Sequence, residues 1–190
     1  DSVCARNDQI VYAGLHGYLK EGPYGDRPAY DDVIQGESGI AGTFQLRDGE
    51  PAVVPSVMAD KVAAVMAVNG ILAAIIKRTR TGRGSYMEMG MFEALTGFNL
   101  VEHQYGGTFI PEDESGRGYP RMLTSDRRPF RTSDGYVCMM AYTDDQWSSF
   151  WDLVGKPEVG RDVRFEKMFN RAKHIVEIQK LANDEFSART

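Results

Sequence analysis

The segment that decides the fold is the longest apolar run of the chain, PSVMADKVAAVMAVNGILAAIIKRTRTGRG (residues 55–84). Pro55 and Ser56 are typical of a helix start, and the basic cluster followed by Gly82 is typical of a helix end. The residues between them are apolar on nearly every side of the predicted helix, so we expect this helix to be buried. Asp60 is the only acidic residue in the segment, and it lies where the helix begins.

A carboxylate in the first turn of a helix lies near backbone N–H groups that have no helical partner and near the positive end of the helix dipole. Both features favour the ionised form of the Asp60 carboxylate. An ionised, partly desolvated carboxylate can act as a nucleophile. On position alone, however, an aspartate that only caps the helix is the commoner case. The pattern therefore indicates a candidate and leaves both interpretations open.

The segments around this helix predict an α/β arrangement with a parallel sheet. Residues 9–15 are apolar and β-prone, which is typical of a strand buried on both faces. Residues 83–91 alternate so that one face is much more apolar than the other, which predicts a second strand. Residues 92–105 then have the pattern of a helix. We predict that residues 1–110 are part of a large α/β domain.

A composition change separates this part from the rest of the chain. Residues 111–128 are rich in Gly, Pro and charge, which predicts a linker. Beyond it, an Asp-Gly pair between two β-prone runs indicates a hairpin, and helices are predicted at 144–154 and 170–187. We expect residues 129–190 to form a small, incomplete α+β domain.

Composition excludes several functional classes. The net charge of −5 leaves no basic patch, so we expect no nucleic-acid partner. Cys4 and Cys138 are too few for a disulfide framework, and the histidines show no metal-ligand spacing, so we predict no metal site. No signal peptide is visible, and the uncharged run 62–76 is shorter than the roughly 20 residues that span a bilayer. We therefore expect a cytoplasmic protein without a membrane partner, or a mitochondrial one if a leader is missing from this sequence.

Several motifs, in order along nearly the whole chain, resemble the family III CoA-transferases. The apolar run is preceded by GPYGDRPAYDDVIQGESG (22–39) and followed by RTGRGSYMEMGM (80–91), and FRTSDGYV (130–137) and GKP (155–157) lie further on. The family includes formyl-CoA and carnitine CoA-transferases and the α-methylacyl-CoA racemases. The resemblance implies a Rossmann-like portion with a parallel sheet, a small α+β domain and an interlocked homodimer.

Members of this family are longer than this chain. The resemblance implies that these residues are an internal portion, and that much of the CoA nucleotide is held by a segment before it. We therefore expect the isolated fragment to be inactive.

In the family, an aspartate at the position of Asp60 is the catalytic nucleophile. The resemblance implies that Asp60 attacks an acyl-CoA thioester. CoA would then form a thioester with Asp60, and an incoming carboxylic acid would take over the CoA from this intermediate. Coenzyme A is thus a co-substrate, and no other cofactor is implied. Both intermediates would hydrolyse in water, so we expect a closed site.

Three more residues stand at family positions near the substrates. Tyr30 and Asp31 match residues that line the acyl pocket, and Met91 matches one that approaches the pantetheine of CoA. Each could instead be an ordinary structural residue. The racemase branch uses a histidine as an acid–base residue at the position of Tyr30. A phenol is a poor proton shuttle at neutral pH, which favours a transferase over a racemase.

Other interpretations remain open. Arg78, Arg80 and Arg83 could reach CoA phosphates, although a basic helix end is explained equally well by the helix dipole. An acyl-CoA racemase or isomerase is the alternative enzyme. A truncated, non-catalytic family member that keeps only the fold is the alternative outside catalysis.

Overall fold

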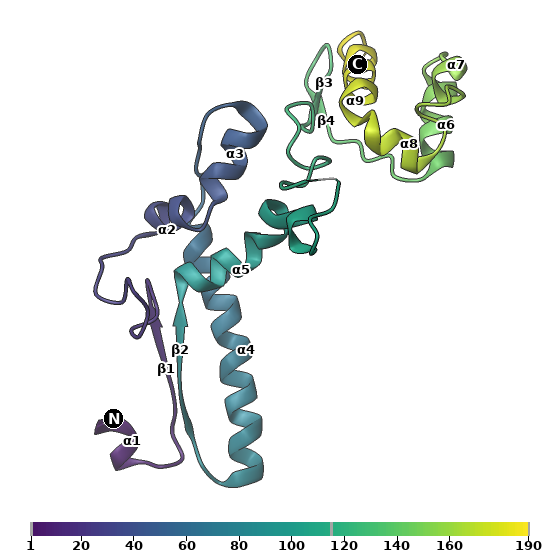
Figure 1. The fold of residues 1–190 in the computed structure, drawn as a ribbon. Coiled ribbons are helices and arrows are strands. Elements are labelled where there is room, and N and C mark those ends of the chain that lie inside the picture. Colours follow the sequence, from purple (N-terminus) through teal and green to yellow (C-terminus); the bar gives the residue numbers. More distant parts are fainter. Residues whose placement is uncertain (1, 115, 190) are drawn as a thin grey trace. The chain divides into compact units, whose positions relative to one another are not determined.

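The computed structural model describes residues 2–114 and 116–189, and the chain divides into two compact units, Asp1–Tyr119 and Pro120–Thr190 (Figure 1). The first unit is rich in helices and contains a small parallel sheet. The second combines helices with a short antiparallel hairpin. The predicted mixed α/β class is therefore confirmed.

The first unit is built around two parallel strands and two long helices, with shorter helices beside them. Its elements in chain order are α1 (Ser2–Arg6), β1 (Val11–His16), α2 (Asp31–Glu37), α3 (Ile40–Asp48), α4 (Met58–Thr81), β2 (Ser85–Gly90), α5 (Met91–Gln104) and the 3-10 helix η1 (Tyr105–Thr108). The two strands pair in register from Val11 opposite Ser85 to His16 opposite Gly90. Both strands lie close to the positions predicted from the sequence.

One apolar cluster holds the helices of the first unit together. Its buried members are Tyr18, Ile34, Ile40, Ala59 and Leu95. They come from the loop after β1, from α2 and α3, and from the first turns of α4 and α5. The starts of the two long helices are therefore packed against α2, and this packing positions the candidate site.

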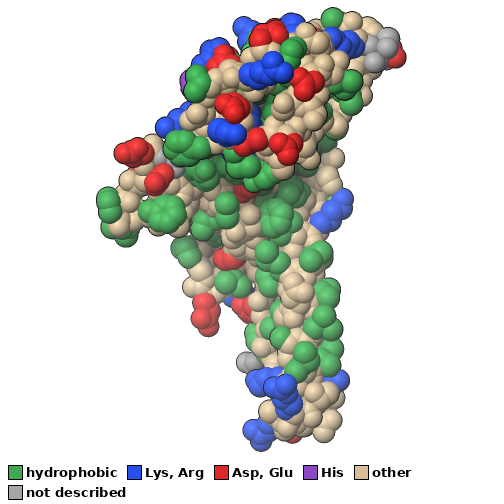
Figure 2. Space-filling model, turned by 90° about the vertical axis from the view of Figure 1, so that its right-hand side faces the viewer, with side chains coloured by type: hydrophobic (Ala, Val, Ile, Leu, Met, Phe, Trp, Pro, Cys, Tyr) green, Lys and Arg blue, Asp and Glu red, His purple; other side chains and the backbone are tan. Residues whose placement is uncertain are grey.

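Helix α4 is much less buried than predicted. Its buried residues are all alanines: Ala59, Ala63, Ala67 and Ala74. Its larger side chains lie more than half exposed at Val65, Val68, Leu72 and Ile76. Figure 2 shows hydrophobic side chains along this helix and Lys and Arg side chains gathered at its lower end. The prediction of a buried helix is wrong for this chain, because only one side of α4 packs against the two strands and its neighbouring helices.

The length of α4 removes the argument against a membrane span that rested on the short uncharged run 62–76. Helix α4 extends over 24 residues, beyond the apolar run 62–76, and is long and apolar enough to cross a membrane by length and composition. Core helices of soluble proteins share this composition, so the observation is weak evidence. The absence of a membrane partner stays a prediction, without the length argument behind it.

The end of α4 was predicted from the sequence more accurately than its start. Gly82 ends the helix in the left-handed region, with φ of 69°, and its N–H bonds to the carbonyl oxygen of Arg78, as predicted. The helix starts at Met58, three residues after Pro55. Helices α2 and α3 were not predicted, because each is short and glycines interrupt the apolar pattern. Gly39, with φ of 88°, separates the two.

The second unit contains one hairpin and a group of short helices. Its elements are β3 (Phe130–Arg131), β4 (Tyr136–Val137), α6 (Asp144–Leu153), α7 (Pro157–Gly160), α8 (Met168–Lys173) and α9 (Ile175–Ser187). The two strands pair antiparallel, as the Asp-Gly signal predicted. The helix predicted at 170–187 is two helices, because the chain leaves the helical conformation at His174.

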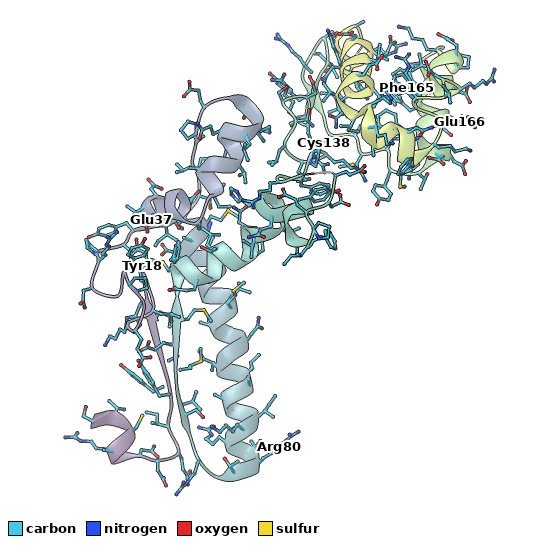
Figure 3. All side chains as sticks on the ribbon, in the orientation of Figure 1. Tyr18, Glu37, Arg80, Cys138, Phe165 and Glu166 are labelled. Atoms are coloured by element: carbon cyan, nitrogen blue, oxygen red, sulfur yellow. The ribbon has the colours of Figure 1, made fainter. Side chains whose placement is uncertain are left out.

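A buried arginine ties the helices of the second unit together. Arg171 is only 3% exposed, and its guanidinium donates to the carbonyl oxygen of Phe165 at 2.6 Å and to Asp144 Oδ1 at 2.8 Å. This hydrogen bond holds the pKa of Asp144 below its usual value. Phe165, labelled in Figure 3, belongs to an aromatic core that also contains Trp147 and Trp151.

Candidate functional site

The candidate site is built on the first turn of α4. Val57 occupies the N-cap position and makes no side-chain cap, so the first N–H groups of the helix need partners from elsewhere. Oδ2 of Asp31, from α2, accepts the backbone N–H of Asp60 at 3.1 Å. A carboxylate from a neighbouring helix therefore supplies part of the cap that the local sequence lacks.

The carboxylate of Asp60 is exposed in this structure. Its neighbour Ala59 is fully buried in the apolar cluster, so the helix directs these two consecutive side chains differently. The expectation of a partly desolvated Asp60 in a closed site is therefore not met by these residues. The physical reason is that α4 packs on one side only, and Asp60 lies outside that contact.

In the structure Asp31 contacts Asp60, whereas Tyr30 is exposed to solvent. Tyr30 precedes α2, and its carbonyl oxygen accepts the N–H of Ile34 at 3.0 Å. Its ring is 77% exposed. Asp31 is half-buried, between its own helix and the start of α4. Of these two predicted pocket residues, only Asp31 makes a hydrogen bond to Asp60.

Met91 lies at a different place in the secondary structure from the one predicted. Strand β2 ends at Gly90, and Met91 is the first residue of α5. Its side chain is partly buried and packs against the apolar cluster that contains Ala59. Met91 is therefore near the start of α4, and in this chain it contributes to the core.

Sequence reasoning missed Gln35. Its Nε2 donates to Asp31 Oδ1 at 2.6 Å and to the carbonyl oxygen of Ser56 at 3.1 Å. Its Oε1 accepts the N–H of Val54 at 2.8 Å. The spacing of four residues from Asp31 to Gln35 was the available signal, because residues at i and i+4 of a helix face each other. That signal required the helix α2, which was not predicted.

A second hydrogen-bonded pair lies beside the apolar cluster. The Tyr18 hydroxyl donates to Glu37 Oε2 at 2.6 Å, and both residues are labelled in Figure 3. This hydrogen bond, followed by burial and the negative charge of Glu37, raises the pKa of Tyr18 to about 12. The ring of Tyr18 also contacts Tyr24 and Phe92 edge-on or tilted. Tyr18 is thus a protonated donor at neutral pH.

The arginines at the end of α4 are far from Asp60 within this chain. Asp60 and Arg80 are 20 residues apart on one helix, which corresponds to about 30 Å. Arg78 Nη1 instead donates to the carbonyl oxygen of Gln9 at 3.4 Å. Arg80, which is labelled in Figure 3, lies at the end of α4 away from Tyr18 and Glu37. These arginines therefore do not share a site with Asp60 in one copy of these residues.

The side chains near Asp60 do not form a metal site. Among residues 2–114 and 116–189, no group of three or more His, Cys, Asp or Glu side chains could hold a metal ion. Cys4 and Cys138 are free thiols. The chemical groups near Asp60 are the Asp31 carboxylate, the Gln35 amide, backbone groups, and the Lys61 ammonium, which donates to the Ser56 hydroxyl at 2.7 Å.

Comparisons with known proteins give one consistent family. The family model described as CoA-transferase family III matches residues 1–190. "Probable fatty acyl-CoA transferase Rv3272" of Mycobacterium tuberculosis is 27% identical over 187 residues, covering 94% of this chain and 48% of its own length. "Succinate--glutarate CoA-transferase" of Agrobacterium fabrum is 25% identical over 188 residues, covering 97% of this chain and 46% of its own length.

Solved structures agree with these relatives. A crystal structure of a CAIB/BAIF family protein from Brucella suis has a TM-score of 0.74 and 26% identity, covering 100% of this chain and 50% of its own. An orthorhombic crystal form of Rv3272 has a TM-score of 0.79 and 25% identity, with the same coverage of both chains. The chain thus spans about half the length of the curated relatives and solved structures that it matches.

Proposed function

The chain belongs to CoA-transferase family III, and from this premise we propose that it takes part in moving CoA from an acyl-CoA thioester to a carboxylic acid. The names of its relatives, which describe CoA transfer, support this proposal. Because the chain spans about half of their length, the activity is proposed for the protein that carries these residues. We expect the 190 residues alone to be inactive.

The observation that carries the proposal is the placement of Asp60. Its carboxylate is exposed, while its backbone N–H is held by Asp31 and the preceding Ala59 is fully buried. A nucleophile needs an accessible reactive atom on a backbone that does not move. The Asp60 carboxylate is accessible, and its backbone N–H is hydrogen-bonded at the start of a long helix.

The proposed reaction proceeds through intermediates on the Asp60 carboxylate. One carboxylate oxygen attacks the thioester carbon, the C–S bond breaks, and CoA leaves as a thiolate with the bonding electrons. The thiolate attacks the aspartyl carbon of the resulting anhydride, which releases the donor acid as a carboxylate and leaves an aspartyl-CoA thioester. The acceptor carboxylate then repeats these two steps in reverse, and Asp60 is regenerated as a carboxylate. Each step exchanges one acyl bond for another, so no redox partner or metal is needed.

The proposal also covers substrate contacts, the homodimer, the cellular location and the domains. Asp31 and Tyr30 are the residues of this chain that would contact the acyl group, and Met91 would approach the pantetheine. The protein would work as a homodimer in the cytoplasm, with CoA as a co-substrate and no other cofactor. Residues 1–110 would belong to the large CoA-transferase domain and residues 129–190 to the small domain, joined by the linker 111–128.

Mass spectrometry of the protein that carries these residues tests the nucleophile. After mixing with a panel of acyl-CoAs and quenching with hydroxylamine, an acyl-aspartyl anhydride or aspartyl thioester leaves a hydroxamate on the reacting aspartate. We expect the hydroxamate on Asp60. The acyl-CoA that produces it identifies the donor class.

Two variants control this experiment. Asp60→Asn is nearly isosteric and should abolish both labelling and transfer while CoA binding persists. Asp32→Asn removes an exposed carboxylate of α2 and should leave both unchanged. Full transfer by Asp60→Asn would show that Asp60 is not the nucleophile. Solvent deuterium entering the α-carbon of an acyl-CoA, with no acceptor acid present, would indicate racemisation instead.

A further inference from the structure

Gln35 lies at the centre of a hydrogen-bond network that joins three segments of the first unit. Its side chain is fully buried in α2. The amide nitrogen donates to Asp31 Oδ1 at 2.6 Å and to the carbonyl oxygen of Ser56 at 3.1 Å, and the amide oxygen accepts from the N–H of Val54 at 2.8 Å. Both amide hydrogens and the amide oxygen are therefore occupied.

These partners permit only one orientation of the Gln35 amide. The nitrogen faces a carboxylate and a carbonyl oxygen, which only accept hydrogen bonds. The oxygen faces a backbone N–H, which only donates. A flipped amide would place oxygen against oxygen at two contacts and N–H against N–H at the third. The orientation of the Gln35 amide is therefore fixed by its hydrogen-bond partners, and its position is fixed by burial.

The network reaches Asp60 by two routes. Gln35 binds one oxygen of Asp31, and the other oxygen of Asp31 accepts the Asp60 N–H at 3.1 Å. Gln35 also binds Val54 and Ser56, which lie in the segment directly before α4. One buried side chain thus holds the start of α4 through a neighbouring carboxylate and through the chain that leads into the helix.

We propose that Gln35 is a positioning residue that sets where the Asp60 carboxylate stands. It holds Asp31 so that the carboxylate bridges to the Asp60 N–H, and it fixes the chain before α4. The effect on the Asp60 backbone is independent of the proposed function. The effect on reaction rate rests on Asp60 being the nucleophile.

Amide hydrogen exchange tests the effect on the backbone. Gln35→Met keeps the side-chain length and removes every hydrogen bond of the amide group. We expect exchange at Asp60 to become about tenfold faster or more, because the loss of about one net hydrogen bond corresponds to a factor of this size. Amides in the middle of α5 should not change. Unchanged exchange at Asp60 in a folded Gln35→Met variant would overturn the proposal.

Ser38→Ala is the matched control for this measurement. Ser38 is also buried at the end of α2, but its hydroxyl donates to the carbonyl oxygen of Gln35 at 3.4 Å and does not reach the segment before α4. Its substitution should leave exchange at Asp60 within about twofold of the wild type. Equal acceleration by both substitutions would reduce Gln35 to a general contributor to stability.

A reciprocal exchange of side chains tests the effect on rate. Gln35→Glu places a carboxylate oxygen against Asp31, so we expect the rate of hydroxamate labelling at Asp60 to fall about 10- to 100-fold, because small misplacements of a reacting group have effects of this size. The KM for acyl-CoA should change little. Combining Gln35→Glu with Asp31→Asn restores a donor–acceptor pair with residue 31 in the opposite direction, while the unfavourable contact with the carbonyl oxygen of Ser56 remains. It should recover about tenfold over Gln35→Glu alone.

The outcomes separate this inference from the proposed function. If Gln35→Met accelerates exchange at Asp60 but the wild type forms no hydroxamate there, Gln35 positions Asp60 and the nucleophile assignment fails. If the hydroxamate forms on Asp60 but Gln35 variants change neither exchange nor rate, the nucleophile assignment stands and the positioning role is wrong.

Discussion

Oδ2 of Asp31 accepts the backbone N–H of Asp60 at 3.1 Å, although the two residues lie 29 positions apart in the chain. The contact places a second carboxylate at the same helix N-terminus that carries the candidate nucleophile. Local sequence leaves the α4 start without a side-chain cap, and tertiary structure supplies part of one. Helix capping and site assembly are therefore the same interaction in this protein.

The capping contact predicts a stability difference between two adjacent aspartates. Asp31→Ala should lower the free energy of unfolding of the first unit by about 1 kcal/mol or more beyond Asp32→Ala, because only Asp31 both caps α4 and accepts a hydrogen bond from the buried Gln35. Both substitutions remove a carboxylate from the first turn of α2, so their effects on that helix dipole are similar. Urea unfolding followed by far-UV circular dichroism measures the difference. Equal losses would show that these two hydrogen bonds of Asp31 contribute no net stability.

The Tyr18–Glu37 pair predicts a loss of stability at alkaline pH. Below about pH 10, Tyr18 is protonated in the folded and unfolded states and its contribution is fully present. Between pH 10 and its folded pKa of about 12, the unfolded state loses the proton first, so stability falls. Tyr18→Phe should show a smaller fall between these values than the wild type. Tyr136→Phe, at a ring that is 73% exposed, is the control and should not change the slope.

The buried guanidinium of Arg171 predicts a large effect confined to the second unit. Arg171→Met leaves the Phe165 carbonyl oxygen and Asp144 without their donor, and should cost about 2 kcal/mol, since Asp144 keeps some contact with water. Both tryptophans of the chain, Trp147 and Trp151, lie in this unit, so their fluorescence reports its unfolding.

The control for Arg171 is another arginine of the same unit. Arg161 is exposed, and Arg161→Met should change stability by less than about 0.5 kcal/mol. A similar unfolding midpoint for the two variants would mean that Arg171 is held by its surroundings and does not organise them.

Two glycines should respond in opposite directions to the same substitution. A Cβ at Gly84 would lie 1.8 Å from the carbonyl oxygen of Ile10, so Gly84→Ala must displace the start of the strand pairing and should destabilise by about 1–3 kcal/mol. A Cβ at Gly97, inside α5, would meet nothing within 4 Å. Gly97→Ala should therefore stabilise by up to about 1 kcal/mol. Thermal unfolding of both variants measures the contrast, and a stabilising Gly84→Ala would contradict the close approach.

Elements whose conformation depends only on residues close to one another in the chain were predictable from the sequence. The end of α4 at Gly82 and the hairpin around Asp134-Gly135 follow from backbone preferences of single residues. The parallel strands β1 and β2 follow from short β-prone segments. The family could likewise be inferred, because its motifs occur in order along the chain.

Short helices escaped prediction because their stability comes from packing. Helix α2 has only seven residues and contains Gly36, so its local preference is weak. Without α2, the i and i+4 relation between Asp31 and Gln35 could not be recognised, and the network around Gln35 was missed.

The sequence by itself determined the long helix α4, the two parallel strands, the hairpin, the family and the choice of Asp60 as a candidate, since these depend on residue types and their order. Only the tertiary structure decided that Asp60 is exposed, that one side of α4 is uncovered, and that Asp31 and Gln35 join at its start. An all-round apolar helix carries no information about which side will be covered. Likewise, hydrogen bonds between residues 19 to 29 positions apart exist only once the backbone has folded.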